Sequence, residues 1–475
     1  MRDVMNLTSW PRPVGRRASR MRRRTPHALL ATTAALAAAI VAPQPAAAAV
    51  PAPGTYYVQS ATTGLNAADS GGAVEQHRPR GDEDRQQWRL KPSGSSYLLE
   101  NTDAPGSCLG RDGDQAATVA CTGGDAFWEI TPLGADRHTL KAPGTTRYLT
   151  VAPKPSGANY PARLALGGAG DLAAWYLTPV SPVTSPMPPQ DRRTLDQVTF
   201  LTAHNAYANG VDGGFAPPFV NLVPNQSRGI ARQLADGVRG FMLDIHQTPD
   251  GAILCHNSCT LVSRPVALWV DLQRIVDFLE ARPDQFVTVF LEDYVDPGVL
   301  RAELARVDGL ADVLHRPDRT GVRQNGWPAM ADLIAANDRL LIFTDHSRSA
   351  DQAAGLTRDA FGVMYQREWT VENHWSMGPG IGASDWSCYS RWYDAGTNLP
   401  LTRTEPGFRP LFVMNHFRDA GITATAATDN AKLADRARRF CQPAARKKPT
   451  FLAVDHYDLG DPAAAVAALN AYTYP

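Results

Sequence analysis

The feature of this 475-residue chain that most restricts its fold is a series of short apolar segments, each ending at a polar side chain. The segments are rich in β-branched and aromatic residues, as is typical of parallel strands buried on both faces. Helical patterns separate several of them from residue 193 onward. This alternation predicts an α/β fold with a TIM-type (β/α) barrel. The expected strands are 198–203, 240–244, 252–256, 286–292, 339–345, 362–366, 411–416 and 450–455.

Nearly every expected strand ends in a histidine or a carboxylate. In α/β barrels the reacting groups lie at the carboxyl ends of the strands, which open on one face of the domain. One polar residue at such a place means little, but seven at corresponding places are hard to explain as loop polarity. We therefore expect an active site among His204, Asp244, His256, Glu292, Asp345, His416 and Asp455.

The net charge of zero hides an asymmetry along the chain. Residues 1–49 hold eight arginines and a single acid, which leaves 39 basic and 46 acidic residues beyond them. A mature chain this acidic is a poor nucleic-acid binder and has no broad polybasic surface for anionic membranes. We expect no nucleic-acid partner and only peripheral contact with a membrane.

Residues 1–49 have the pattern of a secretory signal peptide. An arginine cluster precedes an apolar run at 28–42, and small residues follow at 46–49. The run is too short to span a bilayer, and an A-x-A pattern suits cleavage. The alternatives are a membrane anchor or a disordered leader, and Met21 is a second possible start. The pattern predicts a secreted, extracellular protein.

Six cysteines fit an exported protein with three disulfides. Six cysteines allow 15 pairings, so sequence proximity is the only guide to the pairs Cys108–Cys121, Cys255–Cys259 and Cys388–Cys441. A zinc site at Cys255 and Cys259 is the alternative. Its spacing is not that of a standard zinc finger, and export favours oxidation.

A proline-rich stretch at 179–192 divides the chain. Such stretches form stiff linkers, and we place the linker at 181–192. The expected domains are therefore an all-β domain at 50–180 and the barrel at 193–475, after the signal peptide.

The N-terminal domain carries a threefold echo. Trp88, Trp128 and Trp175 recur 40 and 47 residues apart, each in a short strand-like segment. Repeats of this length without helices predict a closed β architecture of three similar units, with one tryptophan in the core of each.

These segments resemble the ricin-type β-trefoil, whose repeats carry a Q-x-W motif and often a cysteine pair such as Cys108–Cys121. Only the first repeat keeps the glutamine, at Gln86; Ala126 and Ala173 replace it in the others. The resemblance implies carbohydrate binding, so a glycan is an expected partner. A trefoil that has lost sugar binding is the alternative.

The strand-end residues suit cleavage of a phosphodiester. Two histidines can move the two protons, because their unperturbed pKa lies near neutrality. We choose His204 and His256 for these transfers. Asn205, Asp244 and Glu292 form an all-oxygen set of the kind that holds a hard divalent cation, which would stabilise the charge that develops on phosphorus.

The stretch 200–295, with HNAY, GVRGFMLD, CH and LEDY, resembles the phosphatidylinositol-specific phospholipase C X domain of the secreted plant and bacterial branch. The resemblance implies that His204 and His256 are the catalytic histidines. It also implies that Asn205, Asp244 and Glu292 are calcium ligands. The family reaction is attack by the inositol 2-hydroxyl on phosphorus, which releases diacylglycerol.

Two positions depart from the family pattern. Calcium-dependent relatives carry a glutamate where this chain has Met242, which weakens the expectation of calcium. Metal-independent relatives carry an arginine where this chain has His246; a protonated His246 would supply part of the missing charge, and a plain packing role is the alternative. Asp455 is expected to orient His204, while Asp345 and His416 are expected to line the pocket.

The leading expectation is thus a secreted, monomeric phosphoric diester hydrolase that cleaves an inositol phospholipid. The first alternative is a glycerophosphodiester or sphingolipid phosphodiesterase on the same barrel, although such relatives usually show a Glu-x-Asp pair that Met242 breaks. The second is an inactive barrel in a carbohydrate-binding protein. Met242 supports that alternative, and retention of both histidines opposes it.

Overall fold

The computed structural model describes residues 49–155, 159–212, 224–255, 259, 266–393 and 398–474. The expected signal peptide at 1–49 lies almost wholly outside these residues, and His256 lies outside them as well. Within the described residues, no helix has the length and apolar character needed to cross a membrane.

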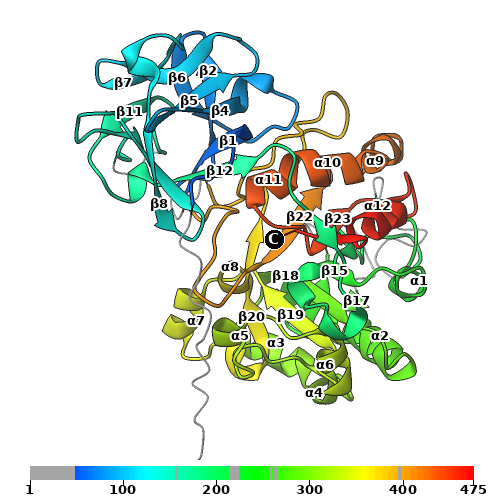
Figure 1. The fold of residues 1–475 in the computed structure, drawn as a ribbon. Helices are drawn as coiled ribbons and strands as arrows, with labels where there is room; N and C mark the ends of the chain where they lie inside the picture. Colours follow the sequence, from blue (N-terminus) through cyan, green and yellow to red (C-terminus); the bar gives the residue numbers. More distant parts are fainter. Residues whose placement is uncertain are drawn as a thin grey trace, which may run out of the picture. The chain divides into compact units, whose positions relative to one another are not determined.

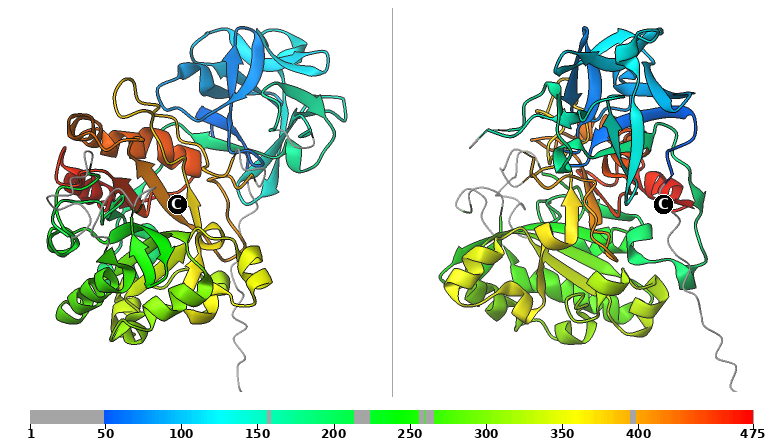
Figure 2. Two further views of the ribbon diagram at one scale, coloured as in Figure 1. Left: turned by 180° about the vertical axis from the view of Figure 1, so that it is seen from behind. Right: turned by 60° about the vertical axis from the view of Figure 1, so that its left-hand side comes forward.

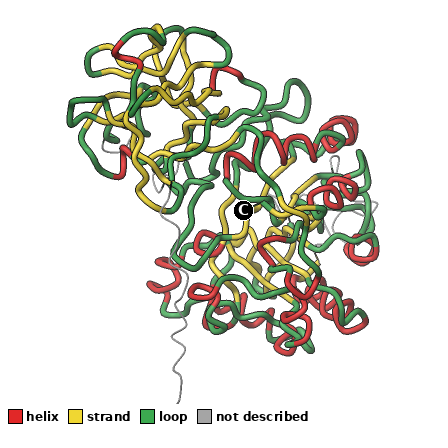
Figure 3. Tube along the Cα trace, in the orientation of Figure 1, coloured by secondary structure: helices red, strands yellow, loops and turns green. Residues whose placement is uncertain are grey.

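The N-terminal part of the described chain is built from antiparallel strands with three short 3-10 turns between them (Figure 3). Pairing of β1 with β4 and of β7 with β11 closes the sheet upon itself. The strands are β1 Gly54–Ser60, β2 Asn66–Ser70, β3 Ala73–His77, β4 Gln87–Ser93, β5 Ser96–Asn101, β6 Ser107–Asp112, β7 Gln115–Ala120, β8 Glu129–Gly134, β9 Arg137–Lys141, β10 Tyr148–Val151, β11 Leu164–Gly167 and β12 Trp175–Pro179.

The threefold repeat seen in the sequence is also present in the contacts of the tryptophans. Trp88, Trp128 and Trp175 have no exposed surface and belong to one hydrophobic core. Each indole N–H donates to a backbone carbonyl of its own repeat, at 2.8–2.9 Å, on Ala67, Leu109 and Leu149 respectively. A buried indole needs such a partner. The prediction that each tryptophan occupies the core of its unit is therefore confirmed.

The C-terminal part holds a mainly parallel sheet with the strand order β20-β19-β18-β15-β14-β23-β22-β21. Its strands have predominantly buried side chains, as expected for strands covered on both faces. They are β14 Phe200–Ala203, β15 Gly240–Thr248, β18 Val287–Tyr294, β19 Leu340–Thr344, β20 Val363–Tyr365, β21 Thr370–Glu372, β22 Leu411–His416 and β23 Phe451–Val454.

The expected closed TIM-type barrel is wrong. In the described sheet β20 and β21 are its two edges and do not pair, so the parallel strands form an open, half-barrel sheet. Only the four residues of α8, Gln366–Trp369, connect these two strands. A parallel pairing needs a crossover of a dozen or more residues, so this connection is too short to close the ring.

One expected barrel strand also has a different role. Residues 252–256 were expected to run parallel with the others, but β16, Gly251–Leu254, pairs antiparallel with the far end of β15. The Pro249–Asp250–Gly251 sequence supplies the tight turn between them. β16 in turn pairs with β17, Val266–Ala267.

Helices cover the outside of the parallel strands, and α2 to α6 gather on one side of them (Figures 1 and 2). The longest, α2, buries one apolar face with Leu272, Ile275 and Leu279 in the core that also contains Phe241 and Val289. The helices are α1 Ile230–Ala235, α2 Leu268–Ala281, α3 Pro297–Leu304, α4 Leu310–Val313, α5 Val322–Asn325, α6 Met330–Ala335, α7 Arg348–Ala354, α9 Thr423–Asn430, α10 Leu433–Arg436, α11 Gln442–Ala445 and α12 Pro462–Leu469.

The proline-rich stretch between the two sheets is partly ordered by pairing. β13, Ser185–Pro186, pairs antiparallel with β24, Tyr472–Thr473.

The predicted disulfides are confirmed, since the structure bonds Cys108 to Cys121, Cys255 to Cys259 and Cys388 to Cys441.

Candidate active site

A cavity of about 340 Å³ opens at the carboxyl ends of the parallel strands. Five strands that are consecutive in the sheet each place a polar residue at this edge, in the order β23, β14, β15, β18 and β19. These residues are Asp455, His204, Asp244, Glu292 and Asp345. The last four line the cavity, and Asp455 lies directly behind His204.

The register of β14 with β23 brings His204 and Asp455 together. Ala203 pairs with Val454, and the His204 N–H donates to the Val454 carbonyl at 3.0 Å, so the next residue of each strand lies side by side. His204 Nδ1 is 2.8 Å from Asp455 Oδ1. The imidazole also stacks on Phe417, with ring centroids 3.5 Å apart and planes 6° from parallel. His204 is therefore held on one edge and one face.

Asn205 follows His204 in the left-handed backbone region, with φ of 43°. Asparagine tolerates this conformation better than most residues. The turn it makes ends β14 and places Asn205 at the cavity wall with 2% of its surface exposed.

Asp244 and Glu292 are direct neighbours across β15 and β18. Burial raises the pKa of Asp244 well above its usual value, and the charges of Glu292 and Asp345 raise it further, while a hydrogen bond from Tyr207 opposes them. Glu292 accepts a hydrogen bond from the Tyr294 hydroxyl. Burial and the neighbouring acids therefore oppose ionisation of Asp244, and a bound cation would favour it.

Asp345 takes part in a second cluster on the same wall. Its Oδ1 accepts the Asp293 backbone N–H at 3.0 Å, and its Oδ2 lies 3.7 Å from Arg391 Nη2. Burial raises the pKa of Asp345 to about 6, and the Arg391 charge limits the rise.

Arg391 was not anticipated, because it lies in the long connection between β21 and β22 rather than at a strand end. Its guanidinium donates to both carboxylate oxygens of Glu372, at 3.1 and 3.2 Å. Glu372 also accepts from Gln366 at 2.8 Å and from Asn415 at 2.7 Å. All four side chains line the cavity, so they form a hydrogen-bonded polar wall there.

Met242 lies on the same face of β15 as Asp244, two residues earlier, and lines the cavity. A thioether therefore occupies the wall where calcium-dependent relatives carry a carboxylate. His246, two residues after Asp244, does not line the cavity. It stacks on Tyr294 with centroids 4.6 Å apart, and burial lowers its pKa. A neutral His246 does not replace the missing charge.

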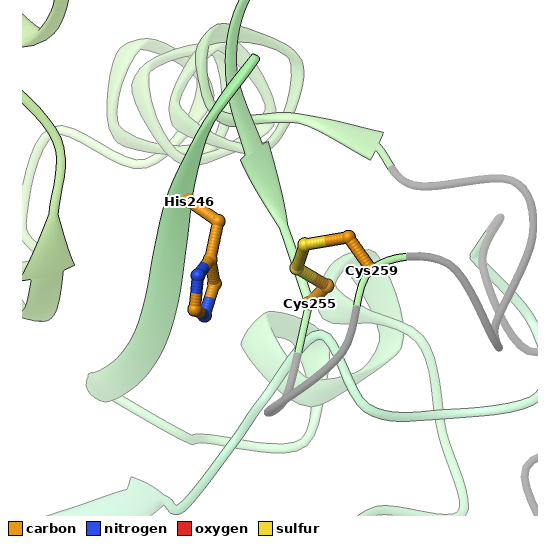
Figure 4. Close-up of side chains that lie close together, drawn as sticks. All are labelled: His246, Cys255 and Cys259. Carbon is orange, nitrogen blue, oxygen red and sulfur yellow. A yellow bond between two sulfur atoms is a disulfide. The ribbon is translucent and has the colours of Figure 1, made fainter.

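His246 instead faces Cys255 and Cys259 (Figure 4). One donor atom from each of these residues lies within 4.8 Å of the others, which is close enough for a metal. The two sulfurs are bonded to each other, however, and a disulfide offers no thiolate ligand. The zinc alternative is therefore not supported in this oxidised structure.

His416 was expected to line the pocket, but it does not reach the cavity. It is buried at 1% exposure, with Nε2 2.9 Å from the Asp429 carbonyl and Nδ1 3.3 Å from Arg436. Burial and the Arg436 charge lower its pKa to about 3. His416 is a neutral packing residue behind the site.

The donor set of Asn205, Asp244 and Glu292 suits a hard cation, since all three offer oxygen and two are carboxyl groups. Among the described residues, no three histidine, cysteine or carboxylate ligands other than the His246 group lie within 4.8 Å of one another. Asp345 is thus not drawn into one compact carboxylate trio with Asp244 and Glu292. A cation here would take only part of its coordination from the acidic side chains.

The region around this cavity is similar to known proteins. Residues 192–376 match the family model described as PI-PLC X 1. The chain is 29% identical over 286 residues to the PI-PLC X domain-containing protein At5g67130 of Arabidopsis thaliana, with 58% of this chain and 62% of that protein covered. It is 24% identical over 296 residues to an uncharacterised secreted protein of Arthroderma benhamiae, covering 59% and 62% of the two chains. The chain spans about three-fifths of the length of these relatives.

Solved structures similar to the chain include a designed threefold symmetric protein, ThreeFoil, at 22% identity and a TM-score of 0.23, covering 26% of this chain and 96% of that one. The Macrolepiota procera ricin B-like lectin in complex with lactose is 17% identical with a TM-score of 0.23, over 27% of this chain and 97% of the lectin. The match of 192–376 includes His204, Asp244, Glu292 and Asp345. Over this segment, the chain is similar to the PI-PLC X family.

Proposed function

We propose that the chain is a secreted phosphoric diester hydrolase that cleaves an inositol phospholipid between glycerol and phosphate. The observation that carries the proposal is the pairing of His204 with the buried Asp455 at the edge of a cavity that also presents Asp244 and Glu292. Such a pair provides a general base beside a site of negative charge.

In this reaction His204 accepts the proton of the inositol 2-hydroxyl, whose oxygen attacks phosphorus. The glycerol oxygen leaves with its bonding electrons and takes up a proton, for which His256 is our candidate donor. The products are diacylglycerol and a cyclic inositol phosphate. Asp455 keeps the proton of His204 on Nδ1, so Nε2 is free to act as the base.

Calcium is the cation we propose for Asn205, Asp244 and Glu292, and when bound it would stabilise the negative charge that develops on phosphorus. The polar wall of Gln366, Glu372, Arg391 and Asn415 offers donors and acceptors suited to a polyol headgroup.

Two exposed aromatic side chains suit peripheral membrane contact. Trp375 lines the cavity and is 44% exposed, and Tyr294 is 56% exposed. Aromatic side chains of this kind favour the membrane–water interface. We further propose that the antiparallel domain binds a glycan and that the protein is a monomer.

Secretion is part of the proposal. It is supported by the three disulfides and by the relative named an uncharacterised secreted protein. It agrees with the signal pattern of residues 1–49.

A panel of headgroups tests the activity. The purified chain is offered phosphatidylinositol, phosphatidylcholine and glycerophosphoinositol, each with calcium and with a chelator. We expect cyclic inositol phosphate from phosphatidylinositol, at a rate that His204→Ala lowers by about 10²- to 10⁴-fold.

Two other outcomes of the headgroup panel would favour a different function. Release of choline phosphate or glycerol phosphate would favour another diesterase on this sheet. Rates equal to those of His204→Ala, together with clear glycan binding, would favour an inactive enzyme domain in a carbohydrate-binding protein. Met242 is the observation that keeps this second function in view.

A further inference from the structure

We propose that Asn225 is a positioning residue that holds the His204–Asp455 pair and the Asn205 amide in their working orientations. This inference rests on the proposed function and deepens it. Asn225 is 5% exposed, precedes α1, and comes from a part of the chain in which the sequence patterns singled out no residue.

The first contact is with the carboxylate. Asn225 Nδ2 donates to Asp455 Oδ1 at 3.0 Å, the same oxygen that lies 2.8 Å from His204 Nδ1. Asn225 Nδ2 is 3.5 Å from His204 Nδ1. An amide NH₂ only donates, and an imidazole nitrogen facing a carboxylate carries its proton. Both groups are therefore donors that converge on one oxygen.

The other oxygen of Asp455 makes this convergence important. Asp455 is 3% exposed, and Oδ2 has no hydrogen-bond partner among the described residues. The orientation of the carboxylate thus depends on the two donors at Oδ1. Without Asn225, the carboxylate can rotate and offer His204 a weaker or misdirected acceptor. His204 then loses its preference for a proton on Nδ1.

The second contact is with Asn205, whose Nδ2 points to Asn225 Oδ1 at 3.5 Å. The nitrogen and oxygen of an amide point in different directions from its trigonal carbon. Anchoring Nδ2 at Asn225 therefore turns Asn205 Oδ1 away from Asn225. Since Asn205 lines the cavity, Oδ1 is the atom it can offer to a cation. A single side chain thereby links the proton-transfer group to the proposed cation site.

Asn225 is itself fixed by its surroundings. The backbone carbonyl of Asn225 accepts a hydrogen bond from the backbone N–H of His456 at 2.7 Å. A Cβ on Gly421 would meet Asn225 Nδ2 at 3.3 Å and Asp455 Oδ2 at 3.0 Å, so the glycine lets the backbone pack closely over both groups. The amide has little freedom to turn.

The test reads the ring tautomer directly. The full chain is labelled with ¹⁵N-histidine, and the His204 signals are those lost in His204→Gln. We expect the proton on Nδ1 in the wild type and a mixture of tautomers in Asn225→Ala. The matched control is Asn470→Ala, which removes an amide that ties Thr199 at the opposite end of β14. The control is expected to keep the wild-type tautomer.

A kinetic arm separates positioning from plain stabilisation. Asn225→Ala is expected to lower kcat by about 10- to 100-fold, the range seen for outer-shell partners, with KM within twofold. Asn225→Ser serves if Asn225→Ala does not fold. A wild-type tautomer in a folded Asn225 variant would overturn the inference. An inactive wild type that still shows the tautomer change would count only against the proposed function.

Discussion

At the scale of single residues, the strand-end rule located much of the candidate site. It selected His204, Asp244, Glu292 and Asp345, and all four line one cavity. It failed at His416, because successive side chains of a strand point to opposite faces. On β22 the penultimate residue, Asn415, faces the cavity, and the last residue does not.

Other residues of the cavity gave no local signal. Arg391 lies far from any strand end, and its position depends on how the 38 residues between β21 and β22 fold back. Asn225 likewise reaches Asp455 across 230 positions of sequence. Contacts of this kind depend on tertiary packing, which periodicity does not encode.

The Met242 position predicts a gain of cation affinity on substitution. Met242→Glu adds a carboxylate on the face that already carries Asp244, and calcium affinity rises with ligand charge. We expect calcium to bind at least ~10-fold more tightly, about 1.4 kcal/mol, by isothermal titration calorimetry. Met242→Gln, of similar size but uncharged, is the control. Equal affinity in the Glu and Gln variants would argue against a cation at Asp244.

At the scale of elements, the apolar runs located most strands of the parallel sheet but not their direction. The long apolar runs at 286–292 and 411–416 are strands β18 and β22. β21, three residues long, was not predicted, although β20, of the same length, was predicted at 362–366. The segment at 252–256 was assigned to the parallel set because an apolar run does not reveal its direction; the tight turn before it makes an antiparallel hairpin instead.

The end of β22 also sets a pH dependence of stability. Burial holds the pKa of His416 at about 3, below its ordinary 6.5. Between these values the unfolded chain binds a proton that the folded chain refuses, so stability is lost as pH falls from 6.5 toward 3. The contribution is about 1.4 kcal/mol per pH unit. Urea unfolding of wild type and His416→Gln at several pH values should show the shallower slope in the variant. Parallel slopes would contradict the assignment.

At the scale of the whole molecule, composition and repeats predicted two kinds of architecture, one antiparallel and one α/β. The threefold spacing of the tryptophans was sufficient for the first. The second was only partly right, because whether eight strands close into a ring depends on the last connection. A four-residue link between β20 and β21 leaves the ring open.

The threefold repeat predicts that replacing any one of the three core tryptophans lowers the free energy of unfolding by a similar amount. Trp88→Phe, Trp128→Phe and Trp175→Phe each remove one indole N–H donor. One buried backbone carbonyl then loses that hydrogen bond. Each change should lower the free energy of unfolding by about 1–3 kcal/mol. Chemical denaturation of the three variants measures this, with Trp375→Phe at an exposed position as the reference. A much smaller penalty at one site would show that its repeat is not equivalent.

The gap between β20 and β21 has a consequence for how the molecule tolerates change. Backbone hydrogen bonds join all the neighbouring parallel strands of the described sheet. Between β20 and β21, by contrast, a side-chain hydrogen bond joins Gln366 and Glu372. Those same side chains form a wall of the cavity. A mutation at this seam therefore alters the edge of the sheet and the lining of the cavity in one step, so the chemistry of the cavity can change there without the loss of a backbone ladder.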